Sequence, residues 1–158
     1  PVIIFEPKRR YWLKGEVDFS DTSFDSFSAQ VVREGTDATI VAYGPLVPVA
    51  LAAAEAAVED GRSIEVIDLR SISPLDVPTV AASVAKTGRL IIAHEAPTFG
   101  GMGGELAAAI TERCFYSLQA PVIRVGGYYM PYPVSRVEEE YVPDIDRILE
   151  AVDRAFDY

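Results

Sequence analysis

The sequence has few of the residues that catalytic and metal sites most often require. Its 158 residues include one histidine, one cysteine and one tryptophan. A single cysteine cannot form an internal disulfide, and one histidine with one cysteine does not supply the ligands of a structural zinc site. No Gly-x-Ser-x-Gly nucleophile elbow and no Gly-Lys-Ser/Thr phosphate loop occur. We therefore find no self-sufficient active site in these residues.

Long apolar runs and a targeting segment are also missing. No window approaches the roughly 20 apolar residues of a membrane span, and the start lacks the pattern of a secretory signal. The chain begins without methionine, and residues 2–5 are an apolar, β-branched run that Glu6-Pro7 ends. We expect residues 2–5 to be the last strand of an upstream domain, and the protein to be soluble and cytoplasmic.

Positive charge is scarce as well. Lysine and arginine number 14 against 24 aspartates and glutamates, which gives a formal charge of −10 at pH 7. The one basic run is Lys8-Arg9-Arg10. This balance opposes binding to nucleic acid or to an anionic membrane, so we expect neither as a partner. A basic protein surface is a better match, and acidity that merely keeps the protein soluble is the alternative.

From residue 29 onward, short β-branched runs alternate with helical patterns. The runs predict strands at residues 29–33, 38–43, 64–69, 90–94 and 122–125. The helical patterns predict helices at about residues 46–60, from the capping residues 73–76 to 86–88, at 103–116 and at 143–156. This alternation requires crossover connections and favours a largely parallel sheet covered on both faces. A chain of this length can bury a full core as one domain.

Residues 6–28 show no sustained periodicity. They carry five aromatic side chains that need cover, namely Tyr11, Trp12, Phe19, Phe24 and Phe27. Such a composition is typical of a linker packed along a surface. We therefore divide the chain into residues 1–28, the end of one domain plus a linker, and residues 29–158, a second domain.

His94 and Glu95 are the most conspicuous polar pair, because they end a predicted strand. Open α/β sheets bind ligands beyond the carboxyl ends of their strands, and a histidine beside a glutamate can act as general acid and base. Adjacent residues leave a strand on opposite faces, however, so we do not expect the two side chains to converge. The alternative is that His94 is hydrogen-bonded at a domain interface.

A glycine-rich stretch, Gly100-Gly101-Met102-Gly103-Gly104, precedes a predicted helix. Its backbone N–H groups could face an anion, although the third glycine of a dinucleotide fingerprint would fall at Leu106. A tight chain crossing or a close subunit contact would explain the glycines equally well. We assign a candidate subunit interface to His94, Glu95, Gly100, Gly101, Gly103 and Gly104.

The last two helical patterns each have one apolar face. Cys114 lies on the apolar face of the third predicted helix, where we expect a buried thiol rather than a nucleophile. In the final helix, one apolar stripe should face the core, formed by Ile145, Ile148, Leu149, Val152 and Phe156. Asp144 and Asp146 lie in its first turn, where acidic side chains complement the helix dipole.

Ordered blocks along nearly the whole chain resemble the β subunit of thiamine-diphosphate-dependent 2-oxoacid dehydrogenases. The blocks are Phe5-Glu6-Pro7-Lys8, Val32-Arg33-Glu34-Gly35-Thr36-Asp37, Val66-Ile67-Asp68-Leu69-Arg70, Ser73-Pro74-Leu75-Asp76, Lys86-Thr87-Gly88-Arg89-Leu90, His94-Glu95-Ala96-Pro97 and Ala120-Pro121-Val122-Ile123-Arg124-Val125. The resemblance covers the end of the pyrimidine-binding domain with its linker (1–28) and the transketolase C-terminal-like domain (29–158). Shorter blocks resemble the branched-chain enzyme more than the pyruvate enzyme: Glu112-Arg113-Cys114-Phe115, Gly127-Tyr128 and the ending Asp157-Tyr158.

The resemblance implies both a fold and an activity. The fold is a three-layer α/β/α sandwich with a five-stranded, mostly parallel mixed sheet whose first strand is antiparallel to the others. The activity is that of an α2β2 component that uses thiamine diphosphate and magnesium to decarboxylate a 2-oxoacid and reductively acylate a lipoyl group. The cofactor-handling residues belong to other domains of that enzyme. We therefore expect no catalytic, cofactor or metal residue here, no bound cofactor, and no activity of this segment alone.

The resemblance also implies three partners: the α subunit, a second β subunit, and the small basic subunit-binding domain of the acyltransferase. We assign acyltransferase docking to Gln119, Asp144, Asp146, Asp157 and Tyr158. Two alternatives stay open for the function as a whole. One is a pyruvate dehydrogenase β subunit of the same family, and the other is an anion-binding regulatory domain that uses the glycine-rich helix start.

Overall fold

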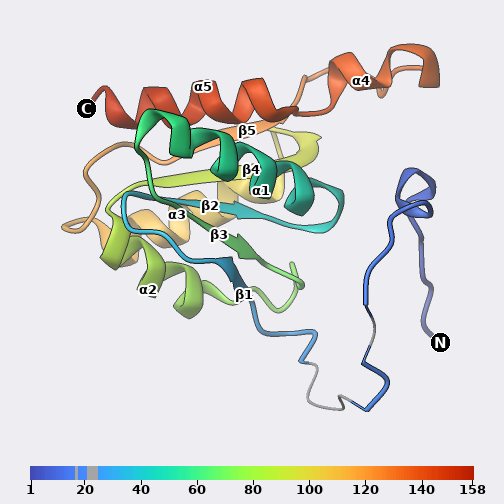
Figure 1. The fold of residues 1–158 in the computed structure, drawn as a ribbon, viewed down its shortest axis with the longest axis horizontal. Coiled ribbons are helices and arrows are strands. Elements are labelled where there is room, and N and C mark those ends of the chain that lie inside the picture. Colours follow the sequence, from blue (N-terminus) through green and yellow to red (C-terminus); the bar gives the residue numbers. More distant parts are fainter. Residues whose placement is uncertain (17, 21–24) are drawn as a thin grey trace.

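A five-stranded sheet forms the middle of the computed structural model, which describes residues 1–16, 18–20 and 25–158 (Figure 1). The strands are β1 (Gln30–Arg33), β2 (Ala38–Ala42), β3 (Ile64–Asp68), β4 (Leu90–Pro97) and β5 (Ile123–Gly127). Their order is β1-β3-β2-β4-β5; β1 runs antiparallel to β3, and the other pairs are parallel. The predicted mixed sheet with an antiparallel first strand is confirmed.

Helices cover both faces of this sheet. Helices α1 (Val47–Ala56) and α5 (Ile145–Phe156) pack on one face, and α2 (Val77–Thr87) and α3 (Met102–Cys114) pack on the other (Figure 1). Strand β2 lies at the centre, and all five of its residues are buried. A strand covered on both faces has no polar side, which is why its sequence is almost continuously apolar. The three-layer sandwich is therefore confirmed.

The ends of the helices follow from local capping, as the sequence predicts. Asp76 accepts a hydrogen bond from the backbone N–H of Thr79 at 3.1 Å and begins α2. Gly88 ends the same helix with a φ of 73°. Helix α1 continues into the 3-10 helix η3 (Ala57–Asp60) and ends at Gly61, with a φ of 72°. Glycine adopts this left-handed conformation without steric cost.

Some boundaries differ from the predictions. Strand β4 extends to Pro97, three residues beyond the predicted end, because its last residue still pairs with Gly127 of β5. Asp144 caps α5 by accepting from the N–H of Arg147 at 2.8 Å, so it precedes the first turn rather than lying in it. Between β5 and α5 lie two short elements for which we made no prediction, the 3-10 helix η4 (Ser135–Val137) and the helix α4 (Glu138–Tyr141).

Residues 1–28 lie largely apart from the sheet and its helices. Residues 2–5 are exposed and pair with no strand among the described residues. That they are the last strand of an upstream domain, whose partner strands this chain does not contain, stays a prediction. The only regular element here is η1 (Lys8–Arg10), within the described part of residues 1–28. Trp12 and Phe19 are 88% and 94% exposed, since no other part of the described chain reaches them. Phe24 lies outside the described residues.

The inner faces of α3 and α5 are buried, as the sequence predicts. Cys114 is a free, buried thiol on the inner face of α3, as predicted. The apolar stripe of α5 also faces the sheet, with Ile148 and Val152 fully buried. Among the residues that the structure describes, no helix is both long enough and apolar enough to cross a membrane.

Candidate functional site

The imidazole of His94 is completely buried and connects the end of β4 to the start of α3. Its Nδ1 lies 2.8 Å from the carbonyl oxygen of Ala96, and its Nε2 lies 3.2 Å from the backbone nitrogen of Gly103. A carbonyl oxygen only accepts, so Nδ1 carries the proton, and Nε2 accepts from the Gly103 N–H. That N–H is one of the donors that a helix start leaves without an intrahelical partner. His94 therefore has a structural role.

Glycines at the start of α3 and in β5 leave room for this imidazole. A Cβ at Gly103 would lie 2.6 Å from Nε2 of His94, and a Cβ at Gly126 would lie 3.0 Å from its Cε1. A Cβ at Gly101 would overlap the carbonyl oxygen of Pro97 and lie 2.8 Å from Cε1 of His94. The glycines thus permit a close approach within the chain. Of the two explanations left open by the sequence, the tight chain crossing is present; Gly100 at the tip of the loop is exposed.

Burial also controls the charge of His94. Loss of solvent lowers the pKa of His94 below its ordinary value of 6.5, and the nearby positive charge of Arg124 adds to this effect, while the hydrogen bond to Ala96 opposes it. Tyr43 packs against the imidazole with ring centroids 6.1 Å apart. A neutral imidazole that uses both nitrogens inside the protein is not available as a general acid or base for a ligand.

The depressed pKa of His94 predicts a pH dependence of stability. The unfolded chain takes up a proton at His94 as the pH falls below about 6.5 while the folded chain does not, so the free energy of unfolding should decrease from pH 7 to pH 5. The maximum slope for one group is about 1.4 kcal/mol per pH unit. Urea unfolding at several pH values should show a shallower dependence for His94→Gln. Parallel curves for the two proteins would contradict this origin of the pH dependence.

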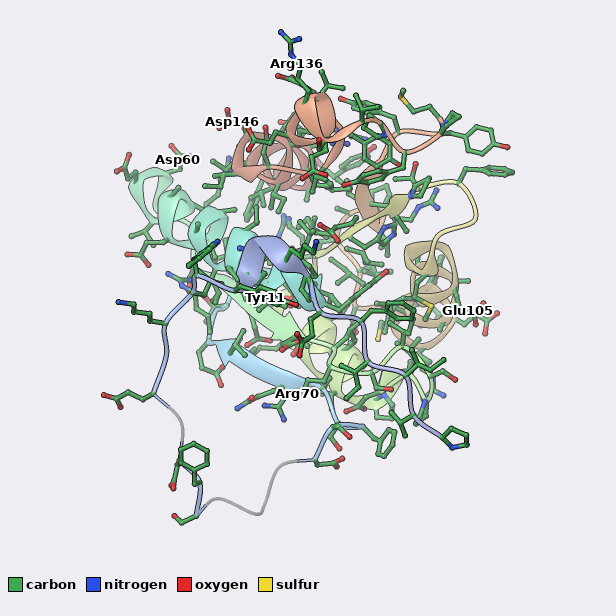
Figure 2. The ribbon with its side chains drawn as sticks, turned by 90° about the vertical axis from the view of Figure 1, so that its right-hand side faces the viewer. Tyr11, Asp60, Arg70, Glu105, Arg136 and Asp146 are labelled. Atoms are coloured by element: carbon green, nitrogen blue, oxygen red, sulfur yellow. The ribbon has the colours of Figure 1, made fainter. Side chains whose placement is uncertain are left out.

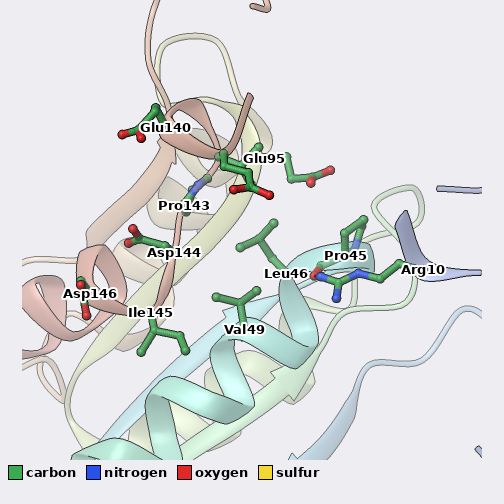
Figure 3. Close-up of a pocket in the computed structure, with 12 residues that line it drawn as sticks. Arg10, Pro45, Leu46, Val49, Glu95, Glu140, Pro143, Asp144, Ile145 and Asp146 are labelled. Carbon is green, nitrogen blue, oxygen red and sulfur yellow. The ribbon is translucent and has the colours of Figure 1, made fainter. Parts of the chain in front are cut away.

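Glu95 lies on the other side of β4 and lines a separate groove of about 580 Å³, as Figure 3 shows. The predicted divergence of His94 and Glu95 is therefore confirmed. The groove runs between the start of α1 and the residues before α5, and we call it the acidic groove. Its carboxylates are those of Glu95, Glu139, Glu140, Asp144 and Asp146.

The linker supplies the arginine at the edge of the acidic groove. Arg10, in η1, also lines the groove, and its guanidinium donates to the carbonyl oxygen of Pro45 (Figure 3). Pro45 follows the central strand β2, so this contact joins the linker to the carboxyl edge of the sheet. Because the groove carries five carboxylates, a guanidinium at its edge also partly offsets their mutual repulsion.

The structure divides the five residues assigned to docking between two places. Asp144 and Asp146 lie at the start of α5 and line the acidic groove. Gln119 and Tyr158 line a different groove, of about 1110 Å³, beside the end of α3. Twelve residues of helix, about 18 Å, separate the two ends of α5. The five residues therefore do not form one patch, and Asp157 is exposed at the Tyr158 end.

The groove beside α3, which we call the α3 groove, is mostly apolar. Phe115 and Leu118 line it from the end of α3, and Pro121 and Val122 line it from the segment before β5. The side chain of Phe115 is 65% exposed, because no other described element covers it. It adds an exposed aromatic group to this apolar surface. An apolar groove with a polar rim is the form that protein docking sites commonly take.

Two smaller hollows, each lined in part by arginines, lie beside the α3 groove. These hollows, of about 390 and 260 Å³, share three lining residues, Thr98, Arg124 and Arg154, and we call them together the arginine pocket. The sequence reasoning missed this pocket. Arg124 is on β5 and Arg154 is on α5, and no local pattern indicates that two residues 30 positions apart lie together.

The sequence reasoning also missed a buried ion pair. Glu65, within β3, is completely buried, and Lys86 of α2 forms a salt bridge with one of its carboxylate oxygens. The other oxygen, Oε1, has no hydrogen-bond partner. The sequence does contain an indication of this pair, because Glu65 interrupts an apolar strand between Ile64 and Val66. Buried carboxylates are almost always paired, so a partner cation was to be expected.

The described residues do not fit a thiamine diphosphate or magnesium site. They contain no group of three or more His, Cys, Asp or Glu side chains placed to hold a metal ion. The one histidine is engaged as described above. We therefore derive no chemical step through either group from this chain.

The sheet order, the three-layer packing and the grooves at the rim define a doubly covered α/β domain. The family model described as "Transketolase, C-terminal domain" matches residues 28–148, and the chain belongs to this family. The sequence resemblance to this domain is thereby confirmed.

The curated relatives are β subunits of 2-oxoacid dehydrogenases. The chain is 55% identical, over its full length, to "Pyruvate dehydrogenase E1 component subunit beta" of Leifsonia xyli subsp. xyli, of which it covers 47%. It is 48% identical over 98% of its length to "3-methyl-2-oxobutanoate dehydrogenase subunit beta" of Mycobacterium tuberculosis, of which it covers 44%. The chain thus spans about half the length of these relatives.

A solved structure supports the same fold assignment. The structure described as "Split gene transketolase, inactive beta4 tetramer" aligns with a TM-score of 0.73 and 29% sequence identity. The alignment covers 90% of this chain and 46% of that one. The similarity therefore extends over most of the chain.

Proposed function

We propose that this chain is the C-terminal domain, with its preceding linker, of the β subunit of a thiamine-diphosphate-dependent 2-oxoacid dehydrogenase. Similarity to such β subunits over 98–100% of the chain supports the proposal. In the whole enzyme, which we place in the cytoplasm, the α subunit and the remainder of β supply thiamine diphosphate and magnesium chemistry. Residues 1–28 are then the end of the pyrimidine-binding domain and the linker.

The proposed substrates are branched-chain 2-oxoacids, with pyruvate as the alternative. The blocks around Cys114, Gly127 and Tyr158 favour the branched-chain enzyme. Overall identity does not separate the two, because a pyruvate dehydrogenase subunit at 55% is followed by branched-chain subunits at 48% and 46% and by another pyruvate subunit at 39%. The role proposed for this domain, assembly, is common to both enzymes.

The α3 groove is the surface that we assign to docking of the acyltransferase's subunit-binding domain. This single observation carries the proposed assembly role: an apolar groove of about 1110 Å³ with Gln119 and Tyr158 on its lining. The apolar floor supplies buried area, and the acidic end of the chain at Asp157 attracts a basic domain. Asp144 and Asp146 do not line this groove, and we assign them to capping and to the acidic groove.

A second surface fits the proposed contact between two β subunits. Next to the glycine-rich loop, Phe99 and Tyr129 pack with ring centroids 4.7 Å apart and are 70% and 77% exposed. Tyr128, Met130 and Tyr132 are also more than half exposed. Exposed apolar groups gathered in one place commonly mark a protein interface. The aromatic groups, rather than Gly103 or His94, which are buried, would make the contact.

The docking proposal predicts a difference between two neighbouring aromatic residues. Phe115→Ala should weaken binding of the acyltransferase's subunit-binding domain by 10-fold or more, because buried aromatic anchors dominate interface energies. Tyr116→Ala, which changes a side chain that is 99% exposed and does not line the groove, should change affinity by less than about 3-fold. Calorimetric titration of the chain with the isolated binding domain would measure both. Equal effects, or no effect of Phe115→Ala, would reject the α3 groove as the docking site.

The alternative function, anion binding at the glycine-rich start of α3, has less support than docking. The N–H of Gly103 donates to His94, and the N–H of Gly104 donates to the carbonyl oxygen of Gly101 at 3.0 Å. Two of the donors at the start of α3, those of Gly103 and Gly104, are therefore already used.

A further inference from the structure

The arginine pocket contains two guanidinium groups, of Arg124 and Arg154, that form no salt bridge with any described residue. Arg124 uses one of its five N–H donors on the carbonyl oxygen of Thr98, at 3.0 Å. Arg154 forms no hydrogen bond and no ion pair within the part of the chain that the structure describes. Glu150, four residues before Arg154, lines one of the two hollows but makes no salt bridge with either arginine. Two positive charges with free donors thus face one concave surface.

A third arginine borders the same pocket but has a structural role. Arg147 donates to the carbonyl oxygen of Tyr141 at 3.2 Å and to that of Gly126, and its guanidinium lies 4.6 Å from the centroid of the Tyr128 ring. These contacts fasten the start of α5 to the end of β5. Because Arg147 uses its guanidinium in these contacts, the donors available to a ligand are those of Arg124 and Arg154.

This arrangement is unexpected in a chain of formal charge −10. Arginines on the surface of so acidic a protein would ordinarily be paired with the abundant carboxylates. Arg124 is instead held in place by a backbone carbonyl, so its remaining donors are oriented before any ligand arrives. An oriented guanidinium with free donors matches the two oxygens of a carboxylate, which it can bind in a bidentate manner.

The arginine pocket is continuous with the α3 groove. Pro121, Val122 and Tyr158 line both the α3 groove and the smaller hollow of the pocket. A partner seated in the α3 groove would therefore reach Arg124 and Arg154 without leaving the surface. This continuity favours an occupant that belongs to the docked protein rather than a small molecule that diffuses separately.

We propose that the arginine pocket receives an acidic side chain of the same subunit-binding domain that docks in the α3 groove. The inference rests on the docking function proposed above. It adds a local attraction between arginines of this chain and an acidic side chain of the partner, opposite in sign to the attraction between the acidic chain and the basic partner. The partner, although basic overall, presents one Asp or Glu to Arg124 and Arg154. A basic partner that relied only on long-range attraction to the acidic chain would lack this contact. The pocket would then fix the orientation in which the partner docks.

Charge reversal at Arg154 separates the two possibilities, because they predict effects of opposite sign. Arg154→Glu makes the chain more acidic, and long-range attraction alone would tighten its binding to a basic domain. The proposed contact instead predicts that affinity falls by at least 10-fold, measured by calorimetric titration with the binding domain. Arg124→Gln should also weaken binding, and circular dichroism would establish that each variant is folded.

The matched control is Arg136→Glu, which makes the same change of charge elsewhere. Arg136, in η4, points into solvent away from the body of the domain (Figure 2). This variant should leave the affinity unchanged or raise it slightly. A partner variant in which the acidic residue becomes lysine should restore binding to Arg154→Glu.

The possible failures are distinguishable. If Arg154→Glu binds as tightly as the unchanged chain or more tightly, while Phe115→Ala weakens binding, the arginine pocket is not part of the interface and the docking proposal stands. If Arg154→Glu and Arg136→Glu weaken binding equally, the effect is not local and the inference is wrong. If the unchanged chain does not bind the domain at all, the docking function itself is refuted.

Discussion

Gly103→Ala should lower the free energy of unfolding by roughly 2 to 3 kcal/mol, although alanine is ordinarily the better residue in a helix. The added Cβ would lie 2.6 Å from Nε2 and 3.0 Å from Cδ2 of His94, and 3.3 Å from Cγ2 of Ile92. His94 cannot move aside, because it is completely buried. The hydrogen bond from the Gly103 N–H to Nε2 would be lost as well. Thermal and urea unfolding would measure the loss.

Gly104→Ala is the matched control for this prediction. The two glycines are adjacent in the first turn of α3, and neither has a positive φ. A Cβ at Gly104 would have one neighbour within 4 Å, the end of the flexible Arg124 side chain at 3.4 Å. The substitution should therefore be neutral or stabilise the domain by up to about 1 kcal/mol, the usual gain of alanine over glycine. Similar losses for both variants would show that His94 does not set the requirement for glycine.

The second large effect is expected at the buried ion pair. Lys86→Met should lower the free energy of unfolding by roughly 2 to 3 kcal/mol, because it leaves the carboxylate of Glu65 buried without a cation. This is less than for a fully enclosed pair, since the Lys86 side chain is 44% exposed and water can partly replace it. The hydrogen bond to Glu65 raises the pKa of Lys86 above its ordinary value, so the ammonium is charged at neutral pH.

Two further variants identify the cause of this loss. Glu34 also binds Lys86, at 3.1 Å, but its side chain is 81% exposed. Glu34→Gln should therefore have a much smaller effect than Lys86→Met. Replacing both members of the buried pair, Glu65→Leu with Lys86→Met, should recover much of the stability, because no buried charge remains. If the double variant were less stable than Lys86→Met alone, the penalty would not come from the unpaired carboxylate. Urea unfolding of the four proteins provides the comparison.

Local features of the sequence determined most of the secondary structure. Gly61 and Gly88 end helices because no other residue adopts a positive φ so readily, and Asp76 begins one because its carboxylate accepts a backbone N–H of the first turn. The alternation of strands and helices indicated a parallel sheet covered on both faces. These features act over a few residues, so the sequence displays them directly. The family was also recognisable from ordered blocks of sequence.

The tertiary structure alone decided which distant residues meet. Strand β1 pairs with β3 rather than with β2, the next strand along the chain, and no local pattern contains that choice. His94 and the glycines that surround it were identified as a group, but only the folded chain shows that the imidazole contacts Gly101 and Gly103. The same holds for Asp144 and Tyr158, which one helix holds apart, and for Arg124 and Arg154, which the packing of α5 beside β5 brings to one pocket. Periodicity and capping are local, whereas a site is made by contacts between segments far apart in sequence.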